Sequence, residues 1–174
     1  ARRDDGIFWI GWDEVLIYFQ NIQLSWNPSL FSFRVTTHGY WPKSQGQEND
    51  AFNVGENPQY TLALSREAID KKPTIWVLLS RHTDKIDEDD ESYLTTHIVR
   101  SGDKERVWYP HGPKTIVNGA YTNNPHVLVR YDVTTFDDRF LSLVLSQHHK
   151  KSDLAYTLSC FSTEPFTLGR PSSL

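Results

Sequence analysis

The sequence predicts an antiparallel β-sandwich preceded by one short amphipathic helix. Three observations support this fold class. The 174 residues suit one large all-β sandwich better than two substantial domains. After the first helix, apolar residues recur with a period of two or in short β-branched and aromatic runs. Clusters of Gly, Pro, Asn and Asp separate these runs, which is typical of the short strands of a sandwich.

Residues 12–19 carry the helical periodicity. Their apolar side chains recur at i, i+3, i+4 and i+7, and acidic residues occupy the first turn, where the helix dipole favours them. This stripe consists of Trp12, Val15, Leu16 and Phe19. We place the boundary between the helix and the strands near residues 25–28, because Asn27-Pro28 ends the helical pattern.

The strands that the sequence predicts differ in how they are covered. Residues 74–80 form a continuous apolar run, which predicts a central strand covered on both faces. The segment 38–58 contains Gly and Pro among polar residues, and we interpret it as a long surface loop. The full set of predicted strands is 60–64, 74–80, 93–100, 106–109, 126–134, 140–147 and 154–161.

Composition excludes several classes of function. The net charge of -4 leaves no global positive field, so we expect no nucleic-acid partner. A single cysteine rules out an intramolecular disulfide and favours a reducing compartment, which predicts an intracellular, cytoplasmic protein. No signal peptide or apolar run of membrane-spanning length is visible. The absence of methionine suggests a fragment or a processed product.

The sequence contains no recognisable catalytic set. Cys160 is in phase with Tyr156 and Leu158 on the expected inner face of a late strand, so we interpret it as a core residue. Gly-x-Ser-x-Gly and phosphate-binding glycine loops are absent, and the seven histidines lack the spacing of a zinc site. We therefore predict no catalytic residues.

The most concentrated charge lies in residues 84–91, where six of the eight side chains are acidic. Ca²⁺ bound by loop carboxylates would relieve their mutual repulsion, and the candidate ligands are Asp84, Asp87, Asp89 and Asp90. The run lacks the glycine and ligand spacing of an EF-hand, so a solvated acidic loop, or one that meets a basic partner, remains open. No other cofactor is expected.

A short basic segment offers a second candidate site. It consists of His148, His149, Lys150 and Lys151, and it could contact a phospholipid headgroup or an acidic partner. The alternative is a solvated hairpin end.

Several motifs taken together resemble the calpain family of cysteine proteases. The stretch Asp4-Asp5-Gly6-Ile7-Phe8-Trp9-Ile10-Gly11-Trp12-Asp13 is similar to the closing segment of the calpain protease core. The rest of the chain resembles the calpain-type, C2-like β-sandwich, and the branch it most resembles is that of the PalB-like calpains. The supporting motifs are Leu24-Ser25-Trp26-Asn27-Pro28, Asn57-Pro58-Gln59-Tyr60, Trp76-Val77-Leu78-Leu79-Ser80-Arg81, Trp108-Tyr109-Pro110 and Tyr156-Thr157-Leu158 leading to Phe161-Ser162.

The resemblance implies a division of the chain and a role. Residues 1–24 would be the tail of the protease core and residues 25–174 a non-catalytic, jelly-roll-like sandwich that regulates it. The catalytic Cys, His and Asn would lie upstream of this chain. The helical stripe would pack between modules, the acidic loop would respond to Ca²⁺, and basic loops would meet phospholipid.

The implied partners are the protease core of the same polypeptide and, from the PalB-like branch, components of the endosomal sorting machinery. Two alternatives stay open: a scaffold module of a catalytically degenerate calpain-like protein, and a membrane-targeting C2-like module. Whether the sequence upstream of Ala1 contains the catalytic residues would separate the first alternative from an active protease.

Overall fold

A computed structural model describes residues 9–19, 27–49, 52–82, 92–102 and 105–172. The chain divides into two compact units, residues 1–30 and 31–174. The boundary predicted between residues 24 and 25 lies outside the described residues. Among the described residues, no helix has the length and apolar character that crossing a membrane requires.

The first unit contains the predicted helix. It is observed as α1 (Trp12–Tyr18), close to the predicted range of 12–19. The Gly11 backbone N–H donates to the Glu14 carboxylate at 3.2 Å, which satisfies one of the amide groups left over at the helix N-terminus. A short 3₁₀ helix, η1 (Pro28–Leu30), closes this unit.

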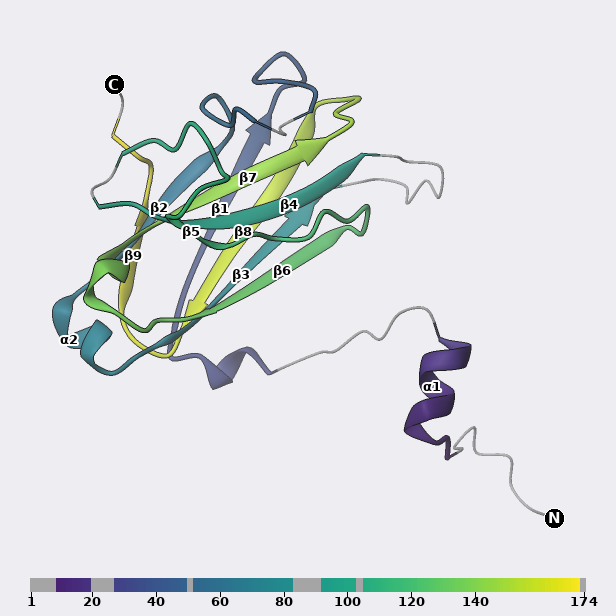
Figure 1. The fold of residues 1–174 in the computed structure, drawn as a ribbon, viewed down its shortest axis with the longest axis horizontal. Helices are drawn as coiled ribbons and strands as arrows, with labels where there is room; N and C mark the ends of the chain where they lie inside the picture. Colours follow the sequence, from purple (N-terminus) through teal and green to yellow (C-terminus); the bar gives the residue numbers. More distant parts are fainter. Residues whose placement is uncertain (1–8, 20–26, 50–51, 83–91, 103–104, 173–174) are drawn as a thin grey trace. The chain divides into compact units, whose positions relative to one another are not determined.

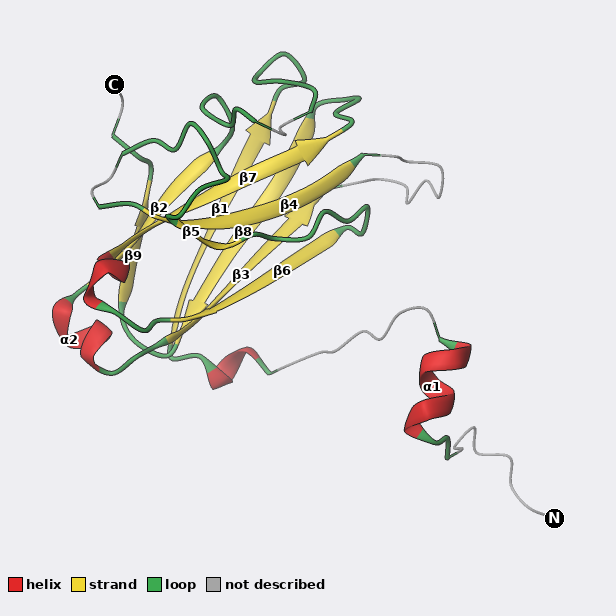
Figure 2. Cartoon of the chain, viewed as in Figure 1, coloured by secondary structure: helices red, strands yellow, loops and turns green. Residues whose placement is uncertain are grey.

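The second unit is the predicted antiparallel β-sandwich, shown in Figures 1 and 2. One sheet has the strand order β1-β8-β3-β6 and the other the order β5-β4-β7-β2-β9, and neighbouring strands pair antiparallel. The elements are β1 (Phe33–Trp41), β2 (Gln59–Leu64), α2 (Arg66–Asp70), β3 (Thr74–Arg81), β4 (Tyr93–Arg100), β5 (Thr115–Val117), β6 (His126–Asp132), η2 (Phe136–Arg139), β7 (Phe140–His148), β8 (Leu154–Ser162) and β9 (Phe166–Gly169).

The core lies between the two sheets and is built from alternate residues of each strand. Every second side chain of a strand points to the same face, so the period-two pattern delivers one apolar face per strand. The innermost set, with no exposed surface, includes Leu62, Ile75, Val77, Leu79, Ile98, Leu141, Leu143, Leu145 and Leu158.

The prediction that residues 74–80 form a central strand covered on both faces is only half confirmed by β3. It is central, since it pairs with β8 on one side and β6 on the other. It is not covered on both faces, because Trp76 and Leu78 remain partly exposed while Ile75, Val77 and Leu79 are buried. The strands whose outer face is covered are β2, β4 and β7, in the other sheet.

The predicted strand 106–109 is wrong, and its place is taken by a loop that covers the five-stranded sheet. The Gln59 side chain substitutes for strand pairing: its Nε2 donates to the carbonyl oxygens of Val54 and Val107 at 2.9 and 2.7 Å, and its Oε1 accepts from the Val107 N–H at 2.8 Å. Val54, Val99, Val107 and Val144 form a second, smaller apolar cluster beneath this loop. A short strand forms later instead, as β5.

The predicted strands do not include β1, and the surface loop predicted for residues 38–58 begins too early, because β1 extends to Trp41. Gly39 indicated a loop, but it pairs with Tyr156, whose ring would lie 2.2 Å from a Cβ at that position. The glycine therefore makes room for an aromatic side chain within a strand. Two other short elements, α2 and β9, carry too few residues for a recognisable period, and the sequence did not predict them.

Candidate functional site

The β3–β4 and β7–β8 connections lie at the same end of the sandwich, which we call the loop end. β3 and β7 end here, and β4 and β8 begin here. Tyr93, at the start of β4, pairs with His148, at the end of β7. Tyr93 and His148, far apart in the sequence, thus lie side by side where β4 begins and β7 ends (Figure 1).

The predicted acidic site, Asp84, Asp87, Asp89 and Asp90, lies outside the described residues, which resume at Ser92. The base from which it leaves is described. Arg81 donates from Nη1 to the Ser92 hydroxyl at 3.2 Å and from Nη2 to the Ser92 carbonyl at 3.0 Å. His82 is held by its backbone N–H on the Ala155 carbonyl at 2.8 Å. The two ends of this connection are therefore joined by hydrogen bonds. Within the described ranges, no group of three or more His, Cys, Asp or Glu side chains could hold a metal ion.

The predicted basic segment is not uniformly exposed. Lys150 is 2% exposed: its ammonium lies 5.3 Å from the centre of the Trp41 ring and donates to the Gln45 carbonyl. His148 and His149 stack with ring centres 4.3 Å apart. The candidate contacts with phospholipid or an acidic partner are thus reduced to His148, His149 and Lys151, since the Lys150 ammonium is turned into the protein.

The connection 42–49 holds the basic segment in place. The His149 backbone N–H donates to Asn49 Oδ1 at 2.9 Å, and the Lys150 N–H donates to the Glu48 carbonyl at 3.2 Å. His149 adopts a positive φ of 55°, which is uncommon for a residue with a side chain. These contacts fix the direction in which the end of β7 turns.

A row of rings leads from the basic segment into the sheet. Tyr121 lies 6.0 Å from His148 on one side and 6.0 Å from His97 on the other, and His97 lies 6.1 Å from His111, all measured between ring centres. His97 has no exposed surface, and neither of its ring nitrogens completes a hydrogen bond. Burial, followed by the charge of His111, lowers the pKa of His97 from 6.5 to about 4, and Asn118 opposes this shift.

The residues of the predicted stripe lie on α1 or directly after it, and their packing against another module stays a prediction. Within their own unit Trp12 and Leu16 are 67% and 65% exposed, Phe19 is also exposed, and no residue of α1 is buried. A helix this short is marginal by itself in water and gains most of its stability from packing its apolar face. The stripe therefore has the character of a surface that another protein element covers.

Cys160 is a core residue, as predicted. It has no exposed surface and pairs with Val35 and Val77 in the four-stranded sheet. Burial raises the pKa of the Cys160 thiol to about 12, so it remains protonated at neutral pH. Because the thiolate is the nucleophile, this side chain is unsuited to protease chemistry.

Sequence reasoning missed a buried carboxylate at the opposite end of the sandwich, which we call the pocket end. Asp138 has no exposed surface. Its Oδ1 accepts two hydrogen bonds from Arg100, at 2.9 and 2.7 Å, and its Oδ2 accepts from the Tyr131 hydroxyl at 2.7 Å and the backbone N–H groups of Thr134 and Thr135. Burial opposes ionisation, but these donors outweigh it and lower the pKa of Asp138. The Thr135-x-x-Asp138 spacing, which resembles the capping pattern of a helix N-terminus, is the sequence signal that could have indicated this site.

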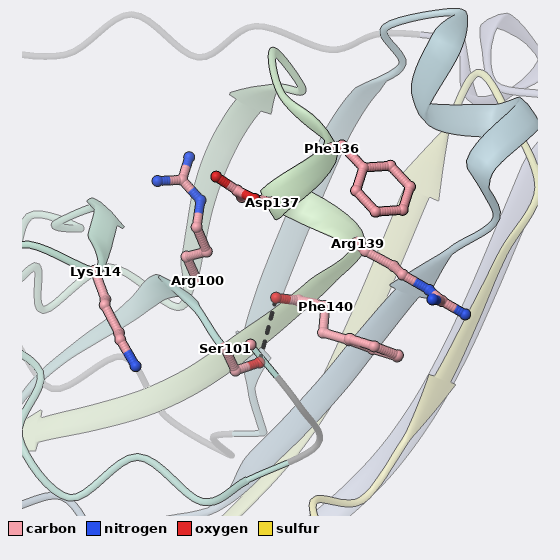
Figure 3. A pocket seen from close by; sticks show the side chains of 8 residues that line it. Arg100, Ser101, Lys114, Phe136, Asp137, Arg139 and Phe140 are labelled. Carbon is pink, nitrogen blue, oxygen red and sulfur yellow. Dashed lines mark hydrogen bonds between the residues drawn. The ribbon is translucent and has the colours of Figure 1, made fainter.

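This carboxylate fixes η2, which forms one wall of a pocket of about 330 Å³. Figure 3 shows the rings of Phe136 and Phe140 on the side of η2, Lys114 on the opposite side, and Asp137 beside Arg100. The Ser101 hydroxyl donates to the Phe140 carbonyl at 3.2 Å across the floor. The remaining lining residues are Gly102 and Arg139.

Comparison with known proteins identifies relatives over almost the whole chain. Calpain-7 of Mus musculus is 37% identical over 170 residues, which are 97% of this chain and 21% of that protein, and calpain-7 of Homo sapiens is 38% identical over the same span. The calpain-like protease palB of Emericella nidulans is 28% identical over 166 residues, or 92% of this chain and 18% of that protein.

These matches confirm the resemblance predicted from the motifs. The chain spans about a fifth of the length of the curated relatives that it matches. A comparison with models of protein families gives no match. The chain belongs to the calpain family, on the branch that contains calpain-7 and the PalB-like proteases.

Proposed function

We propose that this chain is a non-catalytic regulatory and interaction sandwich of a calpain-type intracellular cysteine endopeptidase. It positions or modulates the protease core of the same polypeptide through protein, Ca²⁺ or phospholipid contacts. The observation that carries the proposal is the pairing of Tyr93 with His148 at the loop end. Tyr93 follows the acidic run by two residues, and His148 begins the basic segment.

In this proposal, the adjacency couples two segments that differ in the sign of their charge. Six carboxylates within eight residues repel one another, and Ca²⁺ with its oxygen ligands would reverse that balance. The base of the acidic run is tied by Arg81 and Ser92, while the basic segment is tied to residues 42–49. A change in the charge of one segment would therefore alter the electrostatic energy of the other, because the two segments adjoin the paired strands β4 and β7.

The apolar stripe of α1 supplies the second part of the proposed mechanism. Trp12, Leu16 and Phe19 are exposed in their own unit, and burying them against the protease core would attach the sandwich to its catalytic neighbour. The proposed parent protease contributes the catalytic Cys, His and Asn from outside this chain. The state of Cys160 supports a catalytic cysteine outside this chain, since its buried, protonated thiol is not a nucleophile.

Calcium titration tests the metal arm of the proposal. We expect the 174-residue chain to release or take up heat and to melt at a higher temperature on addition of Ca²⁺, because a ligand that binds only the folded state stabilises it. The variant Asp87→Asn/Asp89→Asn/Asp90→Asn should lose both effects. The matched variant Glu67→Gln/Asp70→Asn/Asp137→Asn, which changes the net charge equally at exposed sites on α2 and η2 of the sandwich, should keep them. Absence of heat and of a melting shift at about millimolar Ca²⁺ would eliminate this arm.

A further inference from the structure

The pocket end presents a site that the calcium response proposed for the loop end does not explain. Its pocket of about 330 Å³ is at the lower end of the range typical of ligand pockets. Two phenylalanine rings, Phe136 and Phe140, contribute its apolar surface, and Phe136 is 49% exposed. Aromatic side chains seated in pockets are frequent anchors of protein interfaces, and these two rings could serve in that way.

The pocket wall is fixed before any ligand arrives. Asp138, with no exposed surface, accepts hydrogen bonds from Tyr131, Thr134 and Thr135 and so holds η2 against the sheet. Arg100 donates twice to the same carboxylate, which neutralises its charge. Because the backbone of η2 is anchored in this way, binding would require little reordering of the wall.

The remaining lining charges favour an acidic ligand. Lys114 and Arg139 are exposed cations of the lining, and Asp137 is its one acidic residue. Asp138 lies buried behind the wall and does not line the pocket. The guanidinium of Arg66 adds a further cation, 5.4 Å from the centre of the Phe136 ring. This local excess of positive charge occurs in a chain whose net charge is -4.

The cations flank the apolar rings and do not converge. In Figure 3, Lys114 and Arg139 extend on opposite sides of the pocket, and the Arg139 guanidinium lies 5.1 Å from the centre of the Phe140 ring. A small anion bound at one of these cations would leave both rings uncovered. A peptide with a large apolar side chain between acidic residues could cover the rings and pair with both cations.

We infer that this pocket binds a short acidic peptide segment of a partner protein, with an apolar side chain seated against Phe136 and Phe140 and carboxylates directed to Lys114 and Arg139. The inference rests on the proposed role of the sandwich as an interaction module. It does not depend on Ca²⁺, so its test is made in EDTA, and its failure is distinguishable from failure of the calcium arm.

Fluorescence anisotropy with two labelled peptides provides the test. The probe is Gly-Asp-Glu-Phe-Asp-Glu-Gly, and its comparison peptide carries Ala in place of Phe. We expect saturable binding of the Phe peptide to the full chain, weakened about tenfold in the Ala peptide. Phe136→Ala should weaken binding by a similar factor, and binding should fall with added salt.

Charge variants locate the site. Lys114→Glu/Arg139→Glu should reduce affinity at least about tenfold, while Arg34→Glu/Lys43→Glu, with the same change in net charge on other exposed residues, should bind as the wild type does. Thermal melts of each variant establish that it is folded. Equal binding of the Phe and Ala peptides, or equal loss in both double variants, would overturn the proposal. So would full displacement by inorganic phosphate, or loss of binding to acidic phospholipid vesicles in the Lys114/Arg139 variant without loss of peptide binding.

Discussion

The two ends of the sandwich are built on different electrostatic principles. At the pocket end, Asp138 is fully buried and receives hydrogen bonds from side chains and backbone alike, so one carboxylate fixes η2. At the loop end, charged side chains gather where connections leave the strands, and the one fully enclosed cation is Lys150 among the residues described there. One buried carboxylate thus fixes the pocket end, whereas a response to charge is what we propose for the loop end.

The largest expected effect is at the pocket end. Asp138→Ala should lower the free energy of unfolding by about 3 to 5 kcal/mol, because Arg100 and two backbone N–H groups lose their acceptor. Its neighbour Asp137, which is exposed, provides the matched control, and Asp137→Ala should change stability by less than about 0.5 kcal/mol. Urea denaturation measures both. Similar small effects in the two variants would refute the claim that Asp138 holds this end together.

The second expected effect is a dependence on pH that originates in the ring row behind the loop end. The pKa of His97 is about 4 in the folded protein against 6.5 ordinarily, so unfolding takes up a proton between these values. This contribution to stability is complete above about pH 6.5 and is lost as the pH falls towards 4, with a total of about 3 kcal/mol. The Asp138 pKa is lowered, so its own contribution is lost only below its ordinary range.

Urea denaturation from about pH 7 to about pH 4.5 separates these contributions. His97→Phe should reduce the loss of stability over this interval, because the buried ring no longer titrates. His126→Phe, which alters an exposed histidine of the four-stranded sheet, should leave the pH dependence unchanged. An unaltered slope in the His97 variant would show that this residue is not the source.

A smaller effect distinguishes two adjacent lysines of the loop end. Lys150→Ala should lower stability by about 1 to 3 kcal/mol, because the Gln45 carbonyl keeps only the Trp41 Nε1 donor and Trp41 loses a covering chain. Lys151→Ala should change stability by less than about 0.5 kcal/mol but reduce pelleting with acidic liposomes at low salt. Failure of the wild type to pellet at low salt would remove phospholipid from the proposed contacts.

The comparison of the two sheets shows what a sequence pattern conveys. Alternation in β6 and the apolar run of β3 correctly indicated strands, because side-chain periodicity reflects the packed face directly. Coverage of the outer face was not predictable, since it depends on a distant loop that Gln59 holds against the sheet. Gly39 indicated a loop for a related reason: the ring that requires it belongs to Tyr156, more than a hundred residues away.

The candidate sites show the same division between local and distant information. The stripe of α1 and the core position of Cys160 reflect local periodicity. The burial of Lys150 and the adjacency of Tyr93 to His148 depend on how strands pair across the fold. The pocket was missed because its residues come from separate elements and loops, and Asp137-Asp138 alone indicated only a turn.

Native-state hydrogen exchange with and without Ca²⁺ tests the proposed response of the loop end most directly. We predict slower exchange on Ca²⁺ binding at loop-end amides, including those of Leu94, His149 and Lys150, because a bound cation would restrain both charged connections. Pocket-end amides such as those of Ser101 and Asp138 should exchange at unchanged rates. Unchanged exchange at the loop end, or an equal change at both ends, would contradict a charge response confined to the loop end.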